Sequence, residues 1–122
     1  MRREEFERLV SEAVEALPPE FKEKLENIAV TVADWPSSYQ LSKVGVRRRE
    51  NLLGLYEGVP LLKRGTGYNL VPPDRITIFR HPLELRCSSP EEMIQEIGRV
   101  VRHEIAHHFG IGDRRLREIE GR

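Results

Sequence analysis

The sequence predicts an α+β domain in which a small twisted mixed sheet of three to four strands packs on two main helices. Apolar residues recur every three or four positions at 3–17 and at 90–109, the pattern of amphipathic helices. Between them lie three short segments rich in β-branched residues, at 28–34, 52–59 and 75–80, which predict strands. Strands grouped between a first helix and a long last helix are typical of the α+β class.

The first predicted helix ends at Pro18-Pro19, because proline lacks the backbone donor that a helix interior needs. Residues 20–25 are expected to add a short helical turn. Residues 37–51 show no clear period, so we expect a loop there. Two more loops are expected at 65–67 and 72–74, where glycine and proline gather.

Glycines interrupt the second predicted strand at Gly54 and Gly58. A glycine inside a strand marks a bulge or a place where another backbone comes close. The third predicted strand is followed by His81-Pro82, which is expected to end it.

The long helix carries several start signals that agree. Ser89 is the expected N-cap, Pro90 occupies the first helical position, and Glu92 completes a capping box. The apolar stripe continues to Phe109, so the helix is about 30 Å long at ~1.5 Å per residue. Gly110 is the expected C-terminal stop.

The composition suits one domain spanning residues 1–122. Lysine plus arginine and aspartate plus glutamate both number 20, so the formal net charge is zero. A dedicated nucleic-acid or membrane-surface binder usually carries a basic excess. We therefore expect neither a nucleic acid nor a membrane as partner.

Cysteine usage and the chain start predict a cytoplasmic location. Cys87 is the only cysteine in the sequence, so no disulfide within the chain is possible, which fits a reducing compartment. The first residues are charged and lack the apolar core of a signal peptide. No apolar run approaches the ~20 residues that a membrane span needs.

The most informative stretch is H-E-x-x-H-x-x-G-x-x-D, at residues 103–113. His103 and His107 are four residues apart, so both imidazoles lie on one helix face and can share one metal ion. Glu104 lies between them and is not needed as a ligand, so it can move protons. The alternative is a surface helix with two solvated histidines.

A glycine after the second histidine allows Asp113 to fold back as a third ligand. Imidazole nitrogens and a carboxylate bind Zn²⁺ at about 2.0–2.2 Å, and three protein ligands leave one position for water, as in catalytic zinc sites. The sequence thus predicts one Zn²⁺ per chain, held by His103, His107 and Asp113, with Glu104 as the catalytic base. Glu118 is the alternative third ligand, although a charged helical face explains it more simply.

The extended motif resembles the signature of the zincin superfamily of metallopeptidases. The segment 53–61, LGLYEGVPL, and the run His107-His108-Phe109-Gly110-Ile111 are similar to a family of very small bacterial proteins, the minimal zincins. The resemblance covers nearly the whole chain. It implies a minimal zincin-like fold whose C-terminal helix binds the metal under the sheet.

By the same resemblance, the residues matching His103, His107 and Asp113 are metal ligands and the one matching Glu104 is the base. The chain departs from metzincins, which carry a methionine turn downstream of the third ligand. Residues 114–122 contain no methionine. We therefore expect a cleft that is open on one side, completed by a second copy of the chain, by a partner protein or by a special substrate.

Three residues of the second predicted strand are candidates for substrate binding, Gly54, Leu55 and Tyr56. An extended peptide can add to a sheet edge through main-chain hydrogen bonds, and glycines permit close approach. The alternative is an ordinary core or bulged strand.

A tetrahedral intermediate also needs a donor for its oxyanion. The sequence does not single one out, and packing or solvation is the usual role of each candidate: Tyr39, Tyr56, Tyr68, Arg80 and His81. His81 is expected in a loop. His108 points about 100° away from His107 around the helix, so we expect it to pack or to support the ligands.

The leading hypothesis is a zinc-dependent metallopeptidase acting on peptides or proteins. The alternative is a metal-binding interaction or regulatory module with little or no peptidase activity. A third reading is a helical protein without metal.

Overall fold

The computed structural model of the chain describes residues 1–58 and 74–121. Within these residues the chain forms a three-stranded mixed sheet and six α-helices, which confirms the predicted α+β class. The expected loop at 65–67 and the candidate Tyr68 lie outside the described residues.

The central strand of the sheet has a parallel neighbour on one side and an antiparallel neighbour on the other. Strand β3 (Asp74–Phe79) lies in the centre, parallel to β1 (Ile28–Ala33) and antiparallel to β2 (Gly54–Gly58). These strands match the three predicted segments to within two residues at each end. Among the described strands, β1 and β2 are therefore the two edges.

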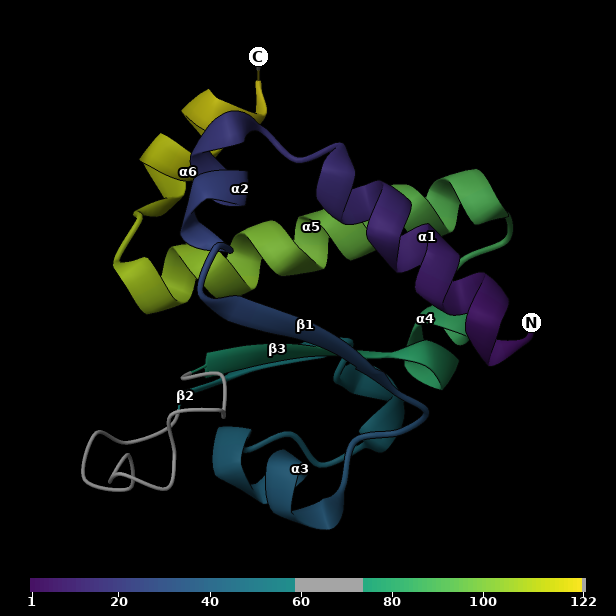
Figure 1. Cartoon of the computed structure of the whole chain (residues 1–122). Coiled ribbons are helices and arrows are strands. Elements are labelled where there is room, and N and C mark those ends of the chain that lie inside the picture. Colours follow the sequence, from purple (N-terminus) through teal and green to yellow (C-terminus); the bar gives the residue numbers. More distant parts are fainter. Residues whose placement is uncertain (59–73, 122) are drawn as a thin grey trace, which may run out of the picture.

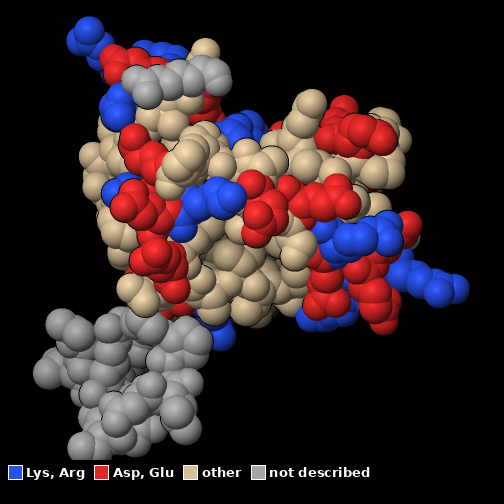
Figure 2. Space-filling model, turned by 45° about the horizontal axis from the view of Figure 1, so that its top comes forward, with Lys and Arg blue, Asp and Glu red and all other residues tan. Residues whose placement is uncertain are grey.

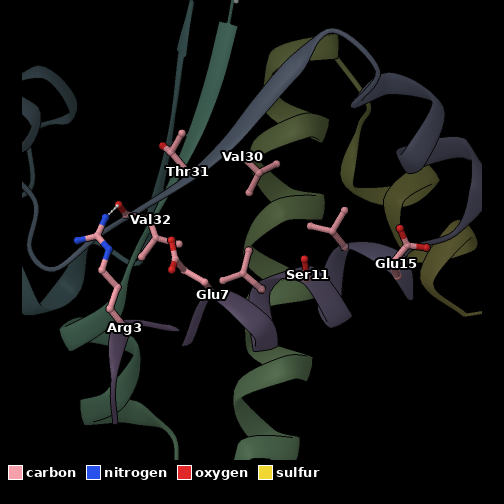
Figure 3. A pocket seen from close by; sticks show the side chains of 9 residues that line it. Arg3, Glu7, Ser11, Glu15, Val30, Thr31 and Val32 are labelled. Carbon is pink, nitrogen blue, oxygen red and sulfur yellow. Dashed lines mark hydrogen bonds between the residues drawn. The ribbon is translucent and has the colours of Figure 1, made fainter. Parts of the chain in front are cut away.

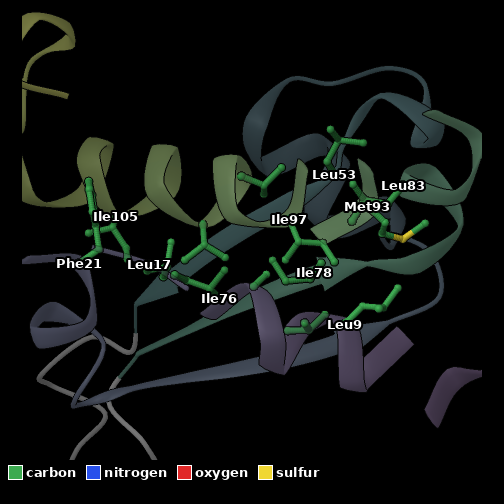
Figure 4. Close-up of a cluster of buried hydrophobic side chains, with 14 of the residues drawn as sticks. Leu9, Leu17, Phe21, Leu53, Ile76, Ile78, Leu83, Met93, Ile97 and Ile105 are labelled. Carbon is green, nitrogen blue, oxygen red and sulfur yellow. The ribbon is translucent and has the colours of Figure 1, made fainter. Parts of the chain in front are cut away.

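One face of the sheet is covered by the two long helices, α1 (Arg3–Glu15) and α5 (Pro90–Phe109). A short helix, α3 (Ser38–Val44), lies on the opposite face (Figure 1). Burying the apolar stripes of both helices against the sheet is the main favourable contribution to folding. Figure 4 shows these side chains converging between α5, α1 and the strands. The fully buried members of this core are Phe6, Phe21, Ile76, Ile78, Leu83, Ile97, Val101 and Ile105.

Helix α5 begins and ends where the sequence predicts. The hydroxyl of Ser89 accepts the backbone N–H of Glu92 at 3.1 Å. The Glu92 carboxylate accepts the N–H of Ser88 rather than that of Ser89, so the predicted capping box is only half formed. Gly110 takes the left-handed conformation at φ +70°, which ends the helix as predicted.

The predicted loop at 37–51 is wrong, because it contains helix α3 (Ser38–Val44) and a 3₁₀ turn at Arg49–Asn51. Ser37 and Gln40 form a complete capping box at the start of α3, and Gly45 ends the helix at φ +71°. These end signals stabilise a helix that buries none of its side chains and so shows no apolar stripe.

The expected loop position of His81 is also wrong. Helix α4 (Arg80–Arg86) begins directly after β3 and includes both His81 and Pro82. Proline is tolerated in a first helical turn, where a backbone N–H has no partner in the helix. The expected turn at 20–25 is confirmed as α2 (Pro19–Lys24).

The last helix, α6 (Asp113–Glu120), folds back against the body of the chain. Leu116 and Ile119 are buried in the core. Arg115 donates to the Glu20 carboxylate of α2 at 3.0 Å. These contacts fix where α6 begins, and therefore where the backbone of Asp113 lies.

Charged side chains of both signs are interspersed on the face shown in Figure 2, with no single broad basic area on it. No helix in the described ranges combines the length and the apolarity that crossing a membrane requires.

Helix α5 approaches β2 closely at Gly54. A Cβ atom at this glycine would lie 2.5 Å from Cγ1 of Val100, well inside van der Waals contact. The close neighbour of this glycine is thus a side chain of α5, whereas a bulge or another backbone was expected. Only a residue without a side chain allows this helix and this strand to pack so tightly.

We expect Gly54→Ala to lower the free energy of unfolding by about 1–3 kcal/mol, because the added methyl group overpacks the contact with Val100. Gly98→Ala is the matched control inside α5, where the added Cβ meets only the end of the Arg102 side chain. It should be neutral or stabilising by about 1 kcal/mol through helix propensity. Urea unfolding measures both, and equal effects of the two variants would contradict the account.

Candidate metal centre

Helix α5 presents the two motif histidines on one face, one turn apart. The ring centroids of His103 and His107 are 6.5 Å apart and the rings meet edge to face. His103 is half-buried, whereas His107 is exposed. The predicted pairing of these imidazoles is therefore present.

Glu104 lies in electrostatic reach of both histidines and touches the sheet. Its carboxylate oxygen Oε1 accepts the backbone N–H of Tyr56 at 2.9 Å. Burial raises the pKa of Glu104 above its usual range, although the hydrogen bond from the Tyr56 N–H and the electrostatic interactions with His107 and His103 act in the opposite direction. A carboxyl whose pKa is shifted towards neutrality is suited to general base work.

The hydrogen-bonding pattern of β2 shows which of its main-chain groups point away from β3. Phe79 donates to the carbonyl of Leu53 at 2.9 Å, so alternate residues of the strand pair with β3. In an antiparallel ladder the intervening residues, Gly54, Tyr56 and Gly58, direct their main-chain groups outwards. The Tyr56 N–H that reaches Glu104 is one of these outward groups.

The side chain of Tyr56 ties β2 to both β3 and α5. Its hydroxyl donates to the Asp74 carboxylate at 2.5 Å. Its ring stacks on that of His108, with centroids 3.9 Å apart and planes at 15°. His108 Nε2 also lies 3.8 Å from Asp74 Oδ2.

Asp113 is exposed and is the first residue of α6, just beyond the turn at Gly110. Across residues 1–58 and 74–121, no three His, Cys, Asp or Glu side chains are grouped so that they could hold a metal ion. Ligation by Asp113 thus stays a prediction. Glu118 forms ion pairs with Arg114 and Arg115 on its own helix, as expected of a charged face.

A comparison with known protein families matches residues 25–122, a span that includes all three strands and the motif helix. The chain belongs to the zincin-like metallopeptidase family. No curated protein matches the chain.

The structure separates the candidate oxyanion donors by their places in the fold. Arg80 and His81 follow the far end of β3, six residues or about 20 Å from Asp74. Arg80 is engaged with Asp34, and His81 contacts Glu84 at 2.6 Å. Tyr56 contacts the motif helix directly, through Glu104 and His108.

The described residues of this zincin-like chain also form a groove at the opposite edge of the sheet, between α1 and β1 (Figure 3). Arg3 donates to the carbonyl of Val32 at 2.7 Å in this groove. Its other lining residues are Glu7, Val10, Ser11, Val14, Glu15, Val30 and Thr31. The groove contains none of the motif residues. The candidate site is therefore identified from the chemistry of its side chains and not from the position of this groove.

The sequence did not single out Asp74, which contacts Tyr56 at the candidate site, and a loop was expected there. The residue begins β3 opposite Gly58, and only the strand register brings it to Tyr56. No local pattern contains that information. His108 packs on Tyr56, as expected, through the stacking of their rings.

In the metal-free protein, we expect Glu104→Gln to raise the free energy of unfolding at pH 7, because an amide carries no charge to desolvate. The pKa of Glu104 is raised on folding, so its stabilising contribution is present below the unfolded value of about 4.3 and is lost as the pH rises through the folded pKa. The advantage of the variant is therefore greatest near neutral pH and vanishes towards pH 4.

Urea unfolding in the presence of a chelator at pH 4 and pH 7 measures this difference. Glu26→Gln is the control, because Glu26 is exposed. A Glu104→Gln variant less stable than the parent at pH 7, or one with an advantage independent of pH, would contradict the account.

Proposed function

We propose that this protein is a zinc-dependent peptidase that hydrolyses peptide bonds with Glu104 as the general base. The observation that carries the proposal is the position of Glu104. The carboxyl is half-buried, lies in reach of His103 and His107, and is hydrogen-bonded to the outward side of β2. A base, a metal-binding pair and a strand edge therefore meet at one place.

The donor set suits zinc. Two neutral imidazoles on one helix face, with a carboxylate as a third ligand, are a known catalytic zinc arrangement. His103 and His107 would hold the ion, and Asp113 is the proposed third ligand. Bound zinc would polarise the scissile carbonyl and lower the pKa of water towards ~7.

The proposed substrate is an extended peptide or protein segment. Exposure rises along β2 from the buried Gly54 and Leu55 to the exposed Gly58. The substrate main chain would therefore pair with the outward groups of the strand beyond the Tyr56 N–H, which already donates to Glu104. Gly54 and Leu55 serve the same site by placing the strand, Gly54 through its contact with α5 and Leu55 through its pairing with Thr77.

Glu104 performs the proton transfers in this proposal. Its carboxylate takes a proton from the attacking water and delivers it to the leaving amine nitrogen. A buried carboxyl with a raised pKa is a stronger base than an exposed one, so it accepts this proton more readily. The net reaction consumes one water for each peptide bond cleaved.

We expect Glu104→Gln to bind zinc as the parent does and to lose about 10²–10⁴-fold in kcat, because the amide cannot accept the proton. Zinc content by mass spectrometry and cleavage of a diverse peptide library measure the two properties separately. Glu26→Gln, at an exposed position, is the control and should keep full activity. A zinc-loaded parent protein that cleaves nothing in the library would contradict the peptidase and favour a metal-binding module.

Zinc should raise the thermal stability of the chain, because a ligand that binds only the folded state stabilises it by about 2.7 kcal/mol at 100 times Kd. His103→Ala and His107→Ala should abolish this effect, and Asp113→Ala should weaken it. His81→Ala is the matched control at the far end of β3 and should keep the full shift. Thermal unfolding with and without a chelator gives the result, and a shift that survives His107→Ala would contradict the assignment.

A further inference from the structure

The residue after the second motif histidine has a contact that the proposed chemistry does not use. His108 keeps 41% of its side chain exposed, yet its ring lies flat on the ring of Tyr56 at 3.9 Å between centroids. An exposed histidine at the end of a helix is hydrated by solvent and does not require an aromatic ring to pack against. The contact therefore fixes the position of Tyr56 relative to α5.

Tyr56 is held at three points, one on β3 and two on α5. The hydroxyl donates to Asp74 at the start of β3, the ring stacks on His108 of α5, and the backbone N–H donates to Glu104. Because the ring and the N–H belong to one residue, fixing the ring at its hydroxyl and on its face restricts the backbone conformations in which Tyr56 can keep these contacts. The stacking contact thus acts on the Glu104 carboxylate through Tyr56.

We propose that His108 is a positioning residue, which holds the Tyr56 N–H against Glu104 and thereby fixes the direction of that carboxylate. The proposal rests on the proposed function, because it assigns His108 a part in the same reaction. A glutamate on a helix surface samples several rotamers, and a hydrogen bond from a fixed donor selects one of them.

A ligand role for His108 conflicts with the geometry. The side chain points about 100° from His107 and about 140° from His103 around the helix axis. Its ring is already stacked on Tyr56, and its Nε2 faces Asp74 at 3.8 Å. His108 therefore supports the site from the side of the strand, whereas His103 and His107 are the residues that would hold the metal.

The test compares His108→Ala with His108→Phe, which keeps an aromatic face for Tyr56 but lacks the ring nitrogens. In the alanine variant we expect kcat to fall by about 10- to 100-fold, since misplacing a reacting group by ~1 Å can cost that much. KM and zinc affinity should change by no more than about twofold. The phenylalanine variant should recover most of kcat.

A second readout needs neither activity nor metal. Amide hydrogen exchange at Tyr56, followed by NMR in the metal-free protein, should be at least about tenfold faster in His108→Ala and close to the parent rate in His108→Phe. Glu104→Ala removes the acceptor and sets the rate of the unbonded amide. His81→Ala removes a histidine at the far end of β3 and should leave Tyr56 exchange unchanged.

The outcomes separate this proposal from the peptidase itself. If the parent cleaves no peptide but Tyr56 exchange responds as expected, the positioning contact stands and the proposed function fails. If Tyr56 exchange is the same in His108→Ala as in the parent, the positioning role is overturned. Loss of zinc in His108→Ala, as in His107→Ala, would overturn it in favour of a ligand.

Discussion

The close packing of helix α5 against strand β2 is the constraint on which the candidate site depends. Gly54 lets the helix approach until Val100 touches the strand, and one turn further along Glu104 meets the N–H of Tyr56. A larger separation would leave the carboxyl in water and the outward side of β2 without contact to the motif. The apolar stripe of α5 makes the approach favourable, because it is buried against the sheet on the same side.

This packing partly buries the carboxyl of Glu104, and burial disfavours its charged form. The Tyr56 N–H and the two histidines offset part of the desolvation, yet the pKa of Glu104 remains raised. A site that keeps a poorly compensated charge reduces the stability of the fold, and such sites are retained where reactivity requires them. The zincin-like family supplies the chemical context in which this arrangement is useful.

The sequence predicted what depends on local periodicity and end signals. The extent of α5 follows from its apolar stripe, with Ser89 and Gly110 at its ends, and the spacing of His103 and His107 puts both on one face. Helix α3 was missed because it has no buried stripe, although its capping box and Gly45 were visible in the sequence. End signals therefore deserve as much weight as periodicity for short surface helices.

The remaining contacts of the candidate site cannot be predicted from residues that are neighbours in the sequence. Tyr56, Asp74 and His108 lie on three different elements, and only the strand register and the packing of α5 bring them together. The backbone position of Asp113 likewise follows from how Leu116 and Ile119 bury α6 in the core. A motif can name such residues as candidates, but their distances follow from contacts between segments far apart in the chain.

The most direct test of the account is zinc-edge anomalous diffraction from crystals of the chain grown with zinc. The account predicts one strong peak per chain bound to the imidazoles of His103 and His107, with the Asp113 carboxylate as third ligand and one position open to water. A peak bound instead by His81 or Cys87, or no peak at the paired imidazoles at saturating zinc, would contradict it.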